Sequence, residues 1–357
     1  MLDIRQSPAS AWPRRLVAGG LLAGALSITS AARSAPPEPA PSTSSAPRDP
    51  VPSSSAASRD DDLKSVLDAP APPTLPALAH RDLTITFEYT AAVIQPKGTD
   101  SGGDAFAYFA HTDFEYPIVP RQWFVGLAND IASAAVPGVG TAFLLGNPEI
   151  YARGVWSSVR GLSSGGGLGV VLPTPRELST VESDVLRTVR TVRPWDLASF
   201  SSLQLTFRPW IDIRHVTGGL IFQLRQAIDW SISLTGPEET PGGSSSGSKP
   251  RLTNFTARLT FYTGYRLSEW LGVGVELWEI YEVTKELPND DARATFALSP
   301  SVRLMLPRVQ PAISFLFPLA TPLRGDVGSY FAARINLGFN FDVRPGKGGA
   351  ATAMALE

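Results

Sequence analysis

Residues 203–234 show the clearest pattern in the chain, two runs of alternating apolar and polar residues around a short turn at 215–219. In the first run Leu205 and Ile213 share one face, and Arg208 falls on the other. This period of two predicts β-strands, because successive side chains of a strand point to opposite faces. A soluble sandwich would bury the apolar face, whereas a membrane barrel would turn it toward lipid and the charged face toward its lumen. The hairpin alone leaves both architectures open.

The same alternation recurs from residue 83 onward and predicts about twelve strands. Pro209 inside the sixth strand has no N–H for the ladder, which predicts a β-bulge at that point. The predicted strands are 83–94, 105–116, 122–132, 143–157, 165–172, 203–214, 220–234, 254–267, 270–283, 295–306, 310–319 and 330–343.

The lengths of the links decide between the two architectures. Outer-membrane barrels have long loops on one rim and tight periplasmic turns on the other, and a soluble sandwich has no reason to sort its links in this way. The sequence therefore predicts an all-β fold, a transmembrane up-and-down antiparallel β-barrel in the bacterial outer membrane. Links after odd-numbered strands are mostly long (96–104, 134–142, 174–201, 235–253, 284–294, 320–329), and links after even-numbered strands are short (117–121, 158–164, 215–219, 268–269, 307–309).

Charged residues on the strands fall opposite the apolar stripe. An arginine facing lipid near the midplane costs about 2–4 kcal/mol, so seven of them would exceed the usual stability of about 5–15 kcal/mol. They are therefore expected to line the pore, together with acidic partners. The predicted pore-lining residues are Glu88, Arg208, Asp212, Arg214, Arg225, Asp229, Arg258, Arg266, Glu276, Arg303, Arg334 and Asp342.

Aromatic residues near the strand ends fit the interfacial girdles of a membrane barrel. The alternative is that they are core aromatics of a soluble β-protein. These residues are Tyr89, Trp123, Trp156, Tyr265, Trp270, Tyr281 and Tyr330.

The longest link, residues 174–201, has the spacing of a helix. Val181, Val185, Val189 and Val192 recur at intervals of three or four residues. Two interpretations stay open: a lid or plug over the mouth of the barrel, or a short outer helix packed on its rim.

The rest of the chain predicts export and flexible ends. Residues 1–32 have a positively charged start, an apolar centre and a small-residue cleavage site, so they predict a signal peptide. Arg14 and Arg15 leave open whether export follows the Sec or the twin-arginine route. Residues 33–79 form a linker rich in Pro, Ser and Ala that is expected to be disordered. The barrel is assigned to 80–343, and 344–357 is a flexible tail.

Enzymatic chemistry finds little support in the sequence. The chain has no cysteine, and no metalloprotease, Walker or dinucleotide motif is present. His80, His111 and His215 lack a serine two residues later, as an outer-membrane phospholipase would need. Asp113 and Glu115 could chelate a cation, although lumen or rim charges are the simpler interpretation. No enzymatic activity, cofactor or resident metal is therefore expected.

Several motifs resemble one family of barrels. They are Gly146-Asn147-Pro148-Glu149 running into Ile150-Tyr151-Ala152-Arg153, the stretch at 166–174, Leu298-Ser299-Pro300-Ser301-Val302-Arg303, and Gln310-Pro311. Over residues 83–343 the chain resembles bacterial outer-membrane transporters related to the MetA phenol-degradation-pathway proteins. The resemblance implies an uptake channel or porin, and it brings no substrate.

Three functions follow as hypotheses. The first is a channel for small solutes through a lumen lined by Arg, Asp and Glu. The second is a non-conducting structural or surface-binding barrel that acts through its extracellular loops, and the third is a barrel hydrolase. The expected partners are outer-membrane lipid, small solutes and the barrel-assembly machinery. The net charge of −2 gives no reason to expect nucleic acid, and the oligomeric state is left open.

Overall fold

The computed structural model describes most of the region from residue 83 to residue 341. The predicted signal peptide 1–32, linker 33–79 and tail 344–357 lie outside the described residues, as does Asp342. No helix in the described part of the chain is long and apolar enough to span a membrane. The described residues are 83–96, 103–120, 122–159, 161–174, 178–234, 252–284, 293–306, 308–320, 322–323 and 327–341.

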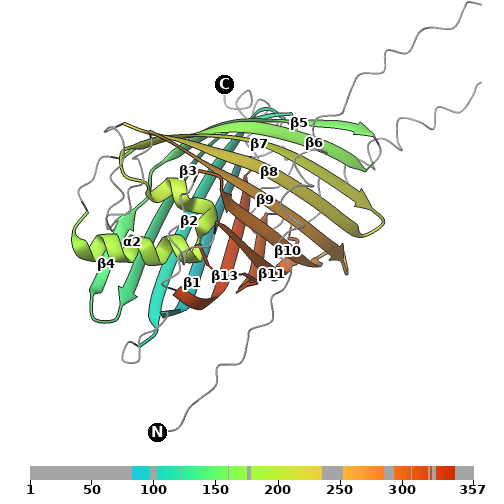
Figure 1. Ribbon diagram of the computed structural model, residues 1–357. Coiled ribbons are helices and arrows are strands. Elements are labelled where there is room, and N and C mark those ends of the chain that lie inside the picture. Colours follow the sequence, from blue (N-terminus) through green and yellow to red (C-terminus); the bar gives the residue numbers. More distant parts are fainter. Residues whose placement is uncertain are drawn as a thin grey trace, which may run out of the picture. The chain divides into compact units, whose positions relative to one another are not determined.

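The strands form a single antiparallel sheet that closes on itself, because β1 pairs with β13 as well as with β2, and β2 pairs with β3 (Figure 1). The closed antiparallel barrel predicted from the alternation is confirmed. The strands are β1 (Leu83–Pro96), β2 (Ala105–Val119), β3 (Trp123–Val136), β4 (Gly140–Leu145), β5 (Glu149–Val159), β6 (Leu162–Val171), β7 (Gln204–Thr217), β8 (Leu220–Ser233), β9 (Thr253–Arg266), β10 (Leu271–Glu282), β11 (Ala294–Leu304), β12 (Val309–Pro318) and β13 (Val327–Phe341).

Thirteen strands occupy twelve positions around the barrel, because β4 and β5 share one of them. β3 pairs with β4 through Ile131–Val136 and with β5 through Trp123–Ala128. The prediction of one continuous strand at 143–157 is therefore wrong, because residues 146–148 separate β4 from β5. The link predicted at 134–142 is also wrong, since only the turn 137–139 separates β3 from β4.

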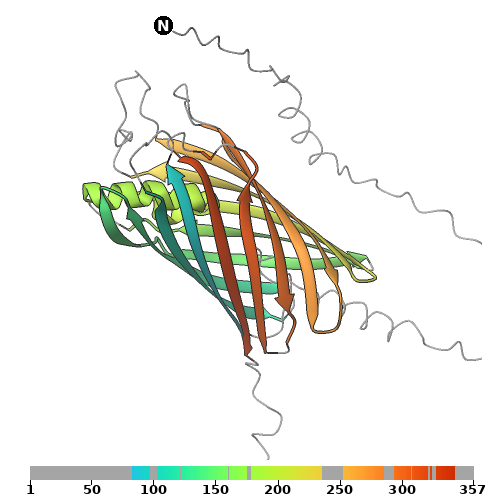
Figure 2. The same cartoon turned by 90° about the horizontal axis from the view of Figure 1, so that it is seen from below.

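The remaining links follow the predicted sorting. We call the end of the barrel where β1 passes to β2 the loop end, and the end where β7 passes to β8 the turn end. Thirty-two residues separate β6 from β7 at the loop end, whereas two separate β7 from β8 at the turn end. Both helices of the described chain lie in the link between β6 and β7: α2 (Thr180–Val192) and the 3-10 helix η1 (Pro194–Phe200). Figure 2 shows α2 at one end of the barrel.

Side chains alternate between an apolar outer face and a polar inner face. On β7, Ile211 and Ile213 are exposed, whereas Asp212 and Arg214 are buried. A closed barrel with an apolar exterior and inward-facing charge is the arrangement that outer-membrane barrels use. The predicted bulge at Pro209 is wrong, because β7 keeps one register with β6 and β8. The proline's missing N–H is accommodated by a local gap in the ladder to β8 instead.

Most of the predicted girdle aromatics are exposed on the outer face, including Trp123, Trp156 and Trp270. Tyr330 contradicts the prediction: it is 4% exposed and packs inside the barrel. Tyr89 is exposed, but it lies at the middle of β1 and not near a strand end. Sequence proximity to a strand end therefore does not determine which face an aromatic occupies.

The lipid-facing position of the outer side chains predicts that a charge placed among them destabilises the barrel. Ile335 is 47% exposed on β13, next to the inward-facing Arg334. An Ile335→Arg substitution should lower the free energy of unfolding in lipid vesicles by about 2–4 kcal/mol, because the new charge faces hydrocarbon. Urea unfolding followed by tryptophan fluorescence measures the change. Ile335→Phe is the control and should stay close to wild type; equal stability of the Arg variant would contradict the lipid-facing assignment.

Candidate functional site: the barrel interior and its plug

Residues 178–201, which we call the plug, fold against the inner face of the barrel at the loop end. Helix α2 begins at a capping box in which Ser179 and Glu182 satisfy each other's backbone N–H groups. Val185, Val189 and Val192 are buried along one side of the helix. The helical spacing seen in the sequence is thus confirmed, and the valine stripe faces the inside of the barrel. Of the two interpretations, the outer helix on the rim is wrong.

The wall behind the plug is built largely from alanines. Alanine occupies inward-facing positions on five strands, where larger side chains would fill the space that α2 and η1 occupy. Leu144, Ile280, Leu316 and Tyr330 complete the apolar contact. The alanines in this cluster are Ala92, Ala105, Ala107, Ala132, Ala134, Ala297 and Ala332. The helix contacts β2, β3, β4 and β13, and Figure 1 shows it beside β4.

Arg193, between the two helices, attaches the plug to the barrel wall. Its guanidinium is 3% exposed and bonds Asp196 within the plug, at 2.6 Å, and Glu88 on β1. It also lies over the rings of Phe109 and Trp195, 3.8 and 4.8 Å from their centroids. Burial alone would lower the pKa of Arg193, but the carboxylates of Asp196 and Glu88 outweigh burial and raise it. The guanidinium therefore stays charged.

Asn147 attaches the other end of the plug. Its buried side chain donates to the carbonyls of Ala198, at 3.1 Å, and Ser201, at 2.6 Å, and accepts from the backbone N–H of Thr174 at 3.1 Å. Its own N–H donates to the Ser199 carbonyl. These bonds explain the interruption between β4 and β5: the backbone leaves the ladder at 146–148 to hold η1. Sequence reasoning used this motif only for family resemblance and missed its structural role.

Aromatic contacts add to both attachments. The Trp195 ring meets Trp278 of β10 edge-on, with centroids 4.7 Å apart, and Phe200 meets Phe109 of β2 at 5.8 Å. The Trp195 carbonyl accepts a 2.7 Å bond from Arg258 of β9. The plug is therefore bound to opposite parts of the wall.

Ion pairs cross the inner face below the plug. Arg208 of β7 bonds Asp229 at 2.9 Å and also Glu149 of β5, and Arg258 approaches Asp229 at 3.3 Å. Arg225 makes two 2.7 Å bonds to Asp212. Every one of these arginines is at least four-fifths buried, so they are largely removed from water.

A second network lies between β10 and β13. Arg334 reaches Glu276 at 3.1 Å, Ser299 at 2.8 Å and Ser314 at 2.9 Å. Both charged side chains are essentially fully buried. Arg334 also lies 5.7 Å from the centroid of Trp195, which connects this network to the plug.

The predicted pore-lining residues are placed as follows. Eleven of the twelve lie in the described part of the chain, all on the inner face of their strands. Arg225, Arg258 and Arg266 are partly exposed. The other eight are buried: Glu88, Arg208, Asp212, Arg214, Asp229, Glu276, Arg303 and Arg334.

Charged residues that the predicted set left out also face inward. Arg153 of β5 forms two 2.6 Å bonds with Glu115 of β2, and the Tyr151 hydroxyl donates to Asp113 at 2.9 Å. Asp113 and Glu115 are therefore partnered by protein groups. Within the described residues, no group of three or more His, Asp or Glu side chains could hold a metal ion.

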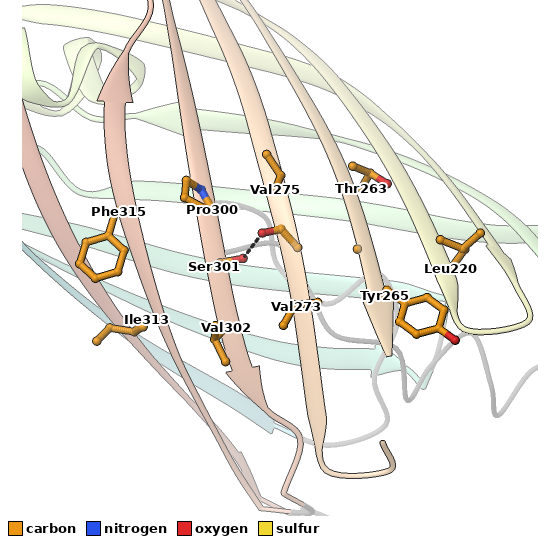
Figure 3. A pocket seen from close by; sticks show the side chains of 12 residues that line it. Leu220, Thr263, Tyr265, Val273, Val275, Pro300, Ser301, Val302, Ile313 and Phe315 are labelled. Atoms are coloured by element: carbon orange, nitrogen blue, oxygen red, sulfur yellow. Dashed lines mark hydrogen bonds between the residues drawn. The ribbon is translucent and has the colours of Figure 1, made fainter. Parts of the chain in front are cut away.

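A groove of about 460 Å³ lies on the outer wall and not in the lumen (Figure 3). It runs over β9 to β12, where small outward-facing side chains such as Val273 and Val302 lie between the larger Tyr265 and Phe315. Its apolar, lipid-facing position places it apart from the charged interior.

Comparison with known proteins supports the fold. The chain resembles the COG4313 outer membrane channel from Pseudomonas putida F1, with 11% identity and a TM-score of 0.53 over 76% of this chain and all of that one. The chain therefore has the fold of an outer-membrane β-barrel. The NanC porin, at 12% identity and a TM-score of 0.44, covers 72% of this chain. No family model and no curated protein sequence matches, so the resemblance to MetA-related transporters stays a prediction.

Proposed function

We propose that this protein is an outer-membrane channel that conducts small solutes through a charged lumen, and that the plug controls access at the loop end. The observation that carries this proposal is the combination of a closed barrel with a densely charged inner face. A purely structural barrel could fill its interior with apolar side chains at less cost, because burying charges requires compensation. Solved channels of the same fold, including the Pseudomonas putida protein, support the proposal.

The distribution of inward-facing charge supports transport as well. The first five strands carry mostly acids, and β7 to β13 carry mostly arginines, so the two walls of the lumen have opposite signs. Such a field would orient dipolar or charged solutes in transit. The acids of the acidic wall are Glu88, Asp113, Glu115, Asp130 and Glu149, and its basic residues are Arg153 and His111. The arginines of the basic wall are Arg208, Arg214, Arg225, Arg258, Arg266, Arg303 and Arg334, and its acids are Asp212, Asp229, Glu276 and Glu282.

The second candidate is a non-conducting barrel that binds a partner through its loops. One observation favours it: the plug is held by a buried ion pair, Asn147 and aromatic contacts, and so could close the lumen permanently. Under this alternative the charged networks below the plug would serve only stability.

Planar-bilayer recording of the refolded protein separates the two candidates. We expect discrete conductance steps from the wild-type chain, and larger or more frequent steps from a variant whose plug attachment is removed. The matching assay is swelling of proteoliposomes in solutions of small sugars and amino acids. Absence of conductance from both the wild type and the released variant would overturn the channel and favour the surface-binding barrel.

A further inference from the structure

Three arginines gather on the inner face at the turn end, away from the plug. Arg214, Arg266 and Arg303 come from β7, β9 and β11. Arg266 and Arg303 both pair with Gly272 of the intervening strand, so no side chain stands between them at that level. The positive charges of Arg266 and Arg303 both act on Arg214. Arg214 is therefore repelled by both of the other cations.

Two polar side chains in this region are more than nine-tenths buried. The Arg303 side chain is 7% exposed, and its charge interacts with Tyr262 and Glu276. Gln223, which pairs with Arg214 across the strands, is 1% exposed, and neither atom of its amide is bonded. Buried polar groups in native proteins are nearly always satisfied, so the Gln223 amide calls for an explanation.

Asp212 and Glu276, the acids that act on Arg214 and Arg303, also bond other arginines. Glu276 bonds Arg334, and Asp212 accepts both bonds of Arg225. A buried excess of guanidinium groups over carboxylates is costly. A negatively charged group from outside the chain would lower that cost, and the guanidinium fork suits the oxygen pair of a carboxylate or phosphate.

Tyr262 completes the surroundings of the cluster. It pairs with Gln223 on β8 and interacts electrostatically with Arg214 and Arg303. Its ring lies flat along the wall, since a Cβ added at Gly264 or Gly274 would come within 2.4 or 2.2 Å of its hydroxyl. Any larger residue at these glycines would displace the phenol, which can donate a hydrogen bond to an oxyanion.

We propose that Arg214, Arg266 and Arg303, with Gln223 and Tyr262, form a binding site for the oxyanion group of a small solute. The role of this site in transport rests on the channel function proposed above; the binding itself does not. A solute that carries a carboxylate or phosphate would be held at the turn end of the basic wall, and the channel would favour anions over cations.

Binding is tested on the full-length protein in detergent by isothermal titration calorimetry, with inorganic phosphate and acetate in separate titrations. We expect saturable binding of at least one, weakened about tenfold or more in Arg303→Gln, as for the loss of one charge-assisted hydrogen bond. Arg308→Gln removes the same charge at an exposed link and should bind like wild type. No saturable binding, or equal binding by Arg303→Gln, would overturn the site.

The choice of anion and the folding of the variant are controlled separately. Preference for acetate would identify carboxylates as the ligand class, and preference for phosphate would identify phosphate esters. Heat-modifiable migration on gels reports whether each variant forms the barrel. If Arg303→Gln does not fold, Arg303→Lys keeps the charge without the planar fork, and unchanged binding by that variant would count against the proposed geometry.

Selectivity is tested in planar bilayers under a potassium chloride gradient. We expect a reversal potential that indicates preferential chloride passage, and a shift toward potassium in Arg303→Gln and Arg266→Gln. Conductance without anion preference would overturn this inference and leave the channel intact. Absence of conductance from both the wild type and a variant whose plug attachment is removed would overturn the channel, and calorimetry alone would then decide whether the anion site exists.

Discussion

Replacement of Arg193 by alanine is expected to raise the open fraction of the channel at least about tenfold. Arg193 bonds Glu88 of the wall and Asp196 of the plug, and it lies over two aromatic rings. Removal of one partner of a buried ion pair costs about 3–5 kcal/mol, which corresponds to a change of more than about 100-fold in the equilibrium between bound and released plug. The expected increase in open fraction is smaller than this change, because the apolar contacts and Asn147 still hold the helices of the plug.

The measurement is single-channel recording in planar bilayers, with open probability as the readout. Arg187→Ala is the matched control: it removes an arginine from α2 whose side chain is 42% exposed and lies 3.7 Å from Asp184 of the same helix. Asn147→Ala should act like Arg193→Ala, because it leaves the carbonyls of Ala198 and Ser201 without their donor. Unchanged open probability in both variants would show that the plug does not control the pore.

The sequence predicts the wall of the barrel well because the physical signal repeats at every strand. Lipid on one side and polar groups on the other impose a period of two, and Leu205, Arg208 and Ile213 follow it without exception. The same rule places eleven of the predicted interior charges on the inner face. One error concerns Pro209, which suggested a bulge. β7 instead keeps one register with β6 and β8, and only its ladder to β8 has a local gap at the proline.

The interior arrangement is less accessible from sequence, because it depends on pairs that are distant along the chain. Glu88 and Arg193 are 105 residues apart, and Asn147 and Ser201 are 54 apart. One signal for the plug is nevertheless present. Alanines alternate with larger residues near the loop ends of several strands, and small inward-facing side chains predict that another element fills the space.

Removal of Glu276 is expected to produce the largest loss of stability. Glu276 is fully buried on β10 and bonds Arg334, which also binds Ser299 and Ser314. In Glu276→Ala the buried Arg334 guanidinium keeps only neutral hydrogen-bond partners, Ser299 and Ser314. Breaking a buried pair in this way costs about 3–5 kcal/mol, a large part of the usual stability of about 5–15 kcal/mol.

Glu279, three residues along the same strand, provides the matched control. It points to the outer face and is about half-buried, so Glu279→Ala removes the same charge without leaving an arginine unpaired. The free energy of unfolding in vesicles should fall by several kcal/mol for Glu276→Ala. It should not fall for Glu279→Ala, because a charge on the outer face of a membrane barrel does not stabilise it. If the two variants lose equal stability, β10 does not present Glu276 to the interior. The double variant Glu276→Leu/Arg334→Leu removes both charges. If it recovers the stability lost in Glu276→Ala, the carboxylate serves to compensate the charge of Arg334. Both charges are then kept for a purpose other than stability, as a conducting lumen requires.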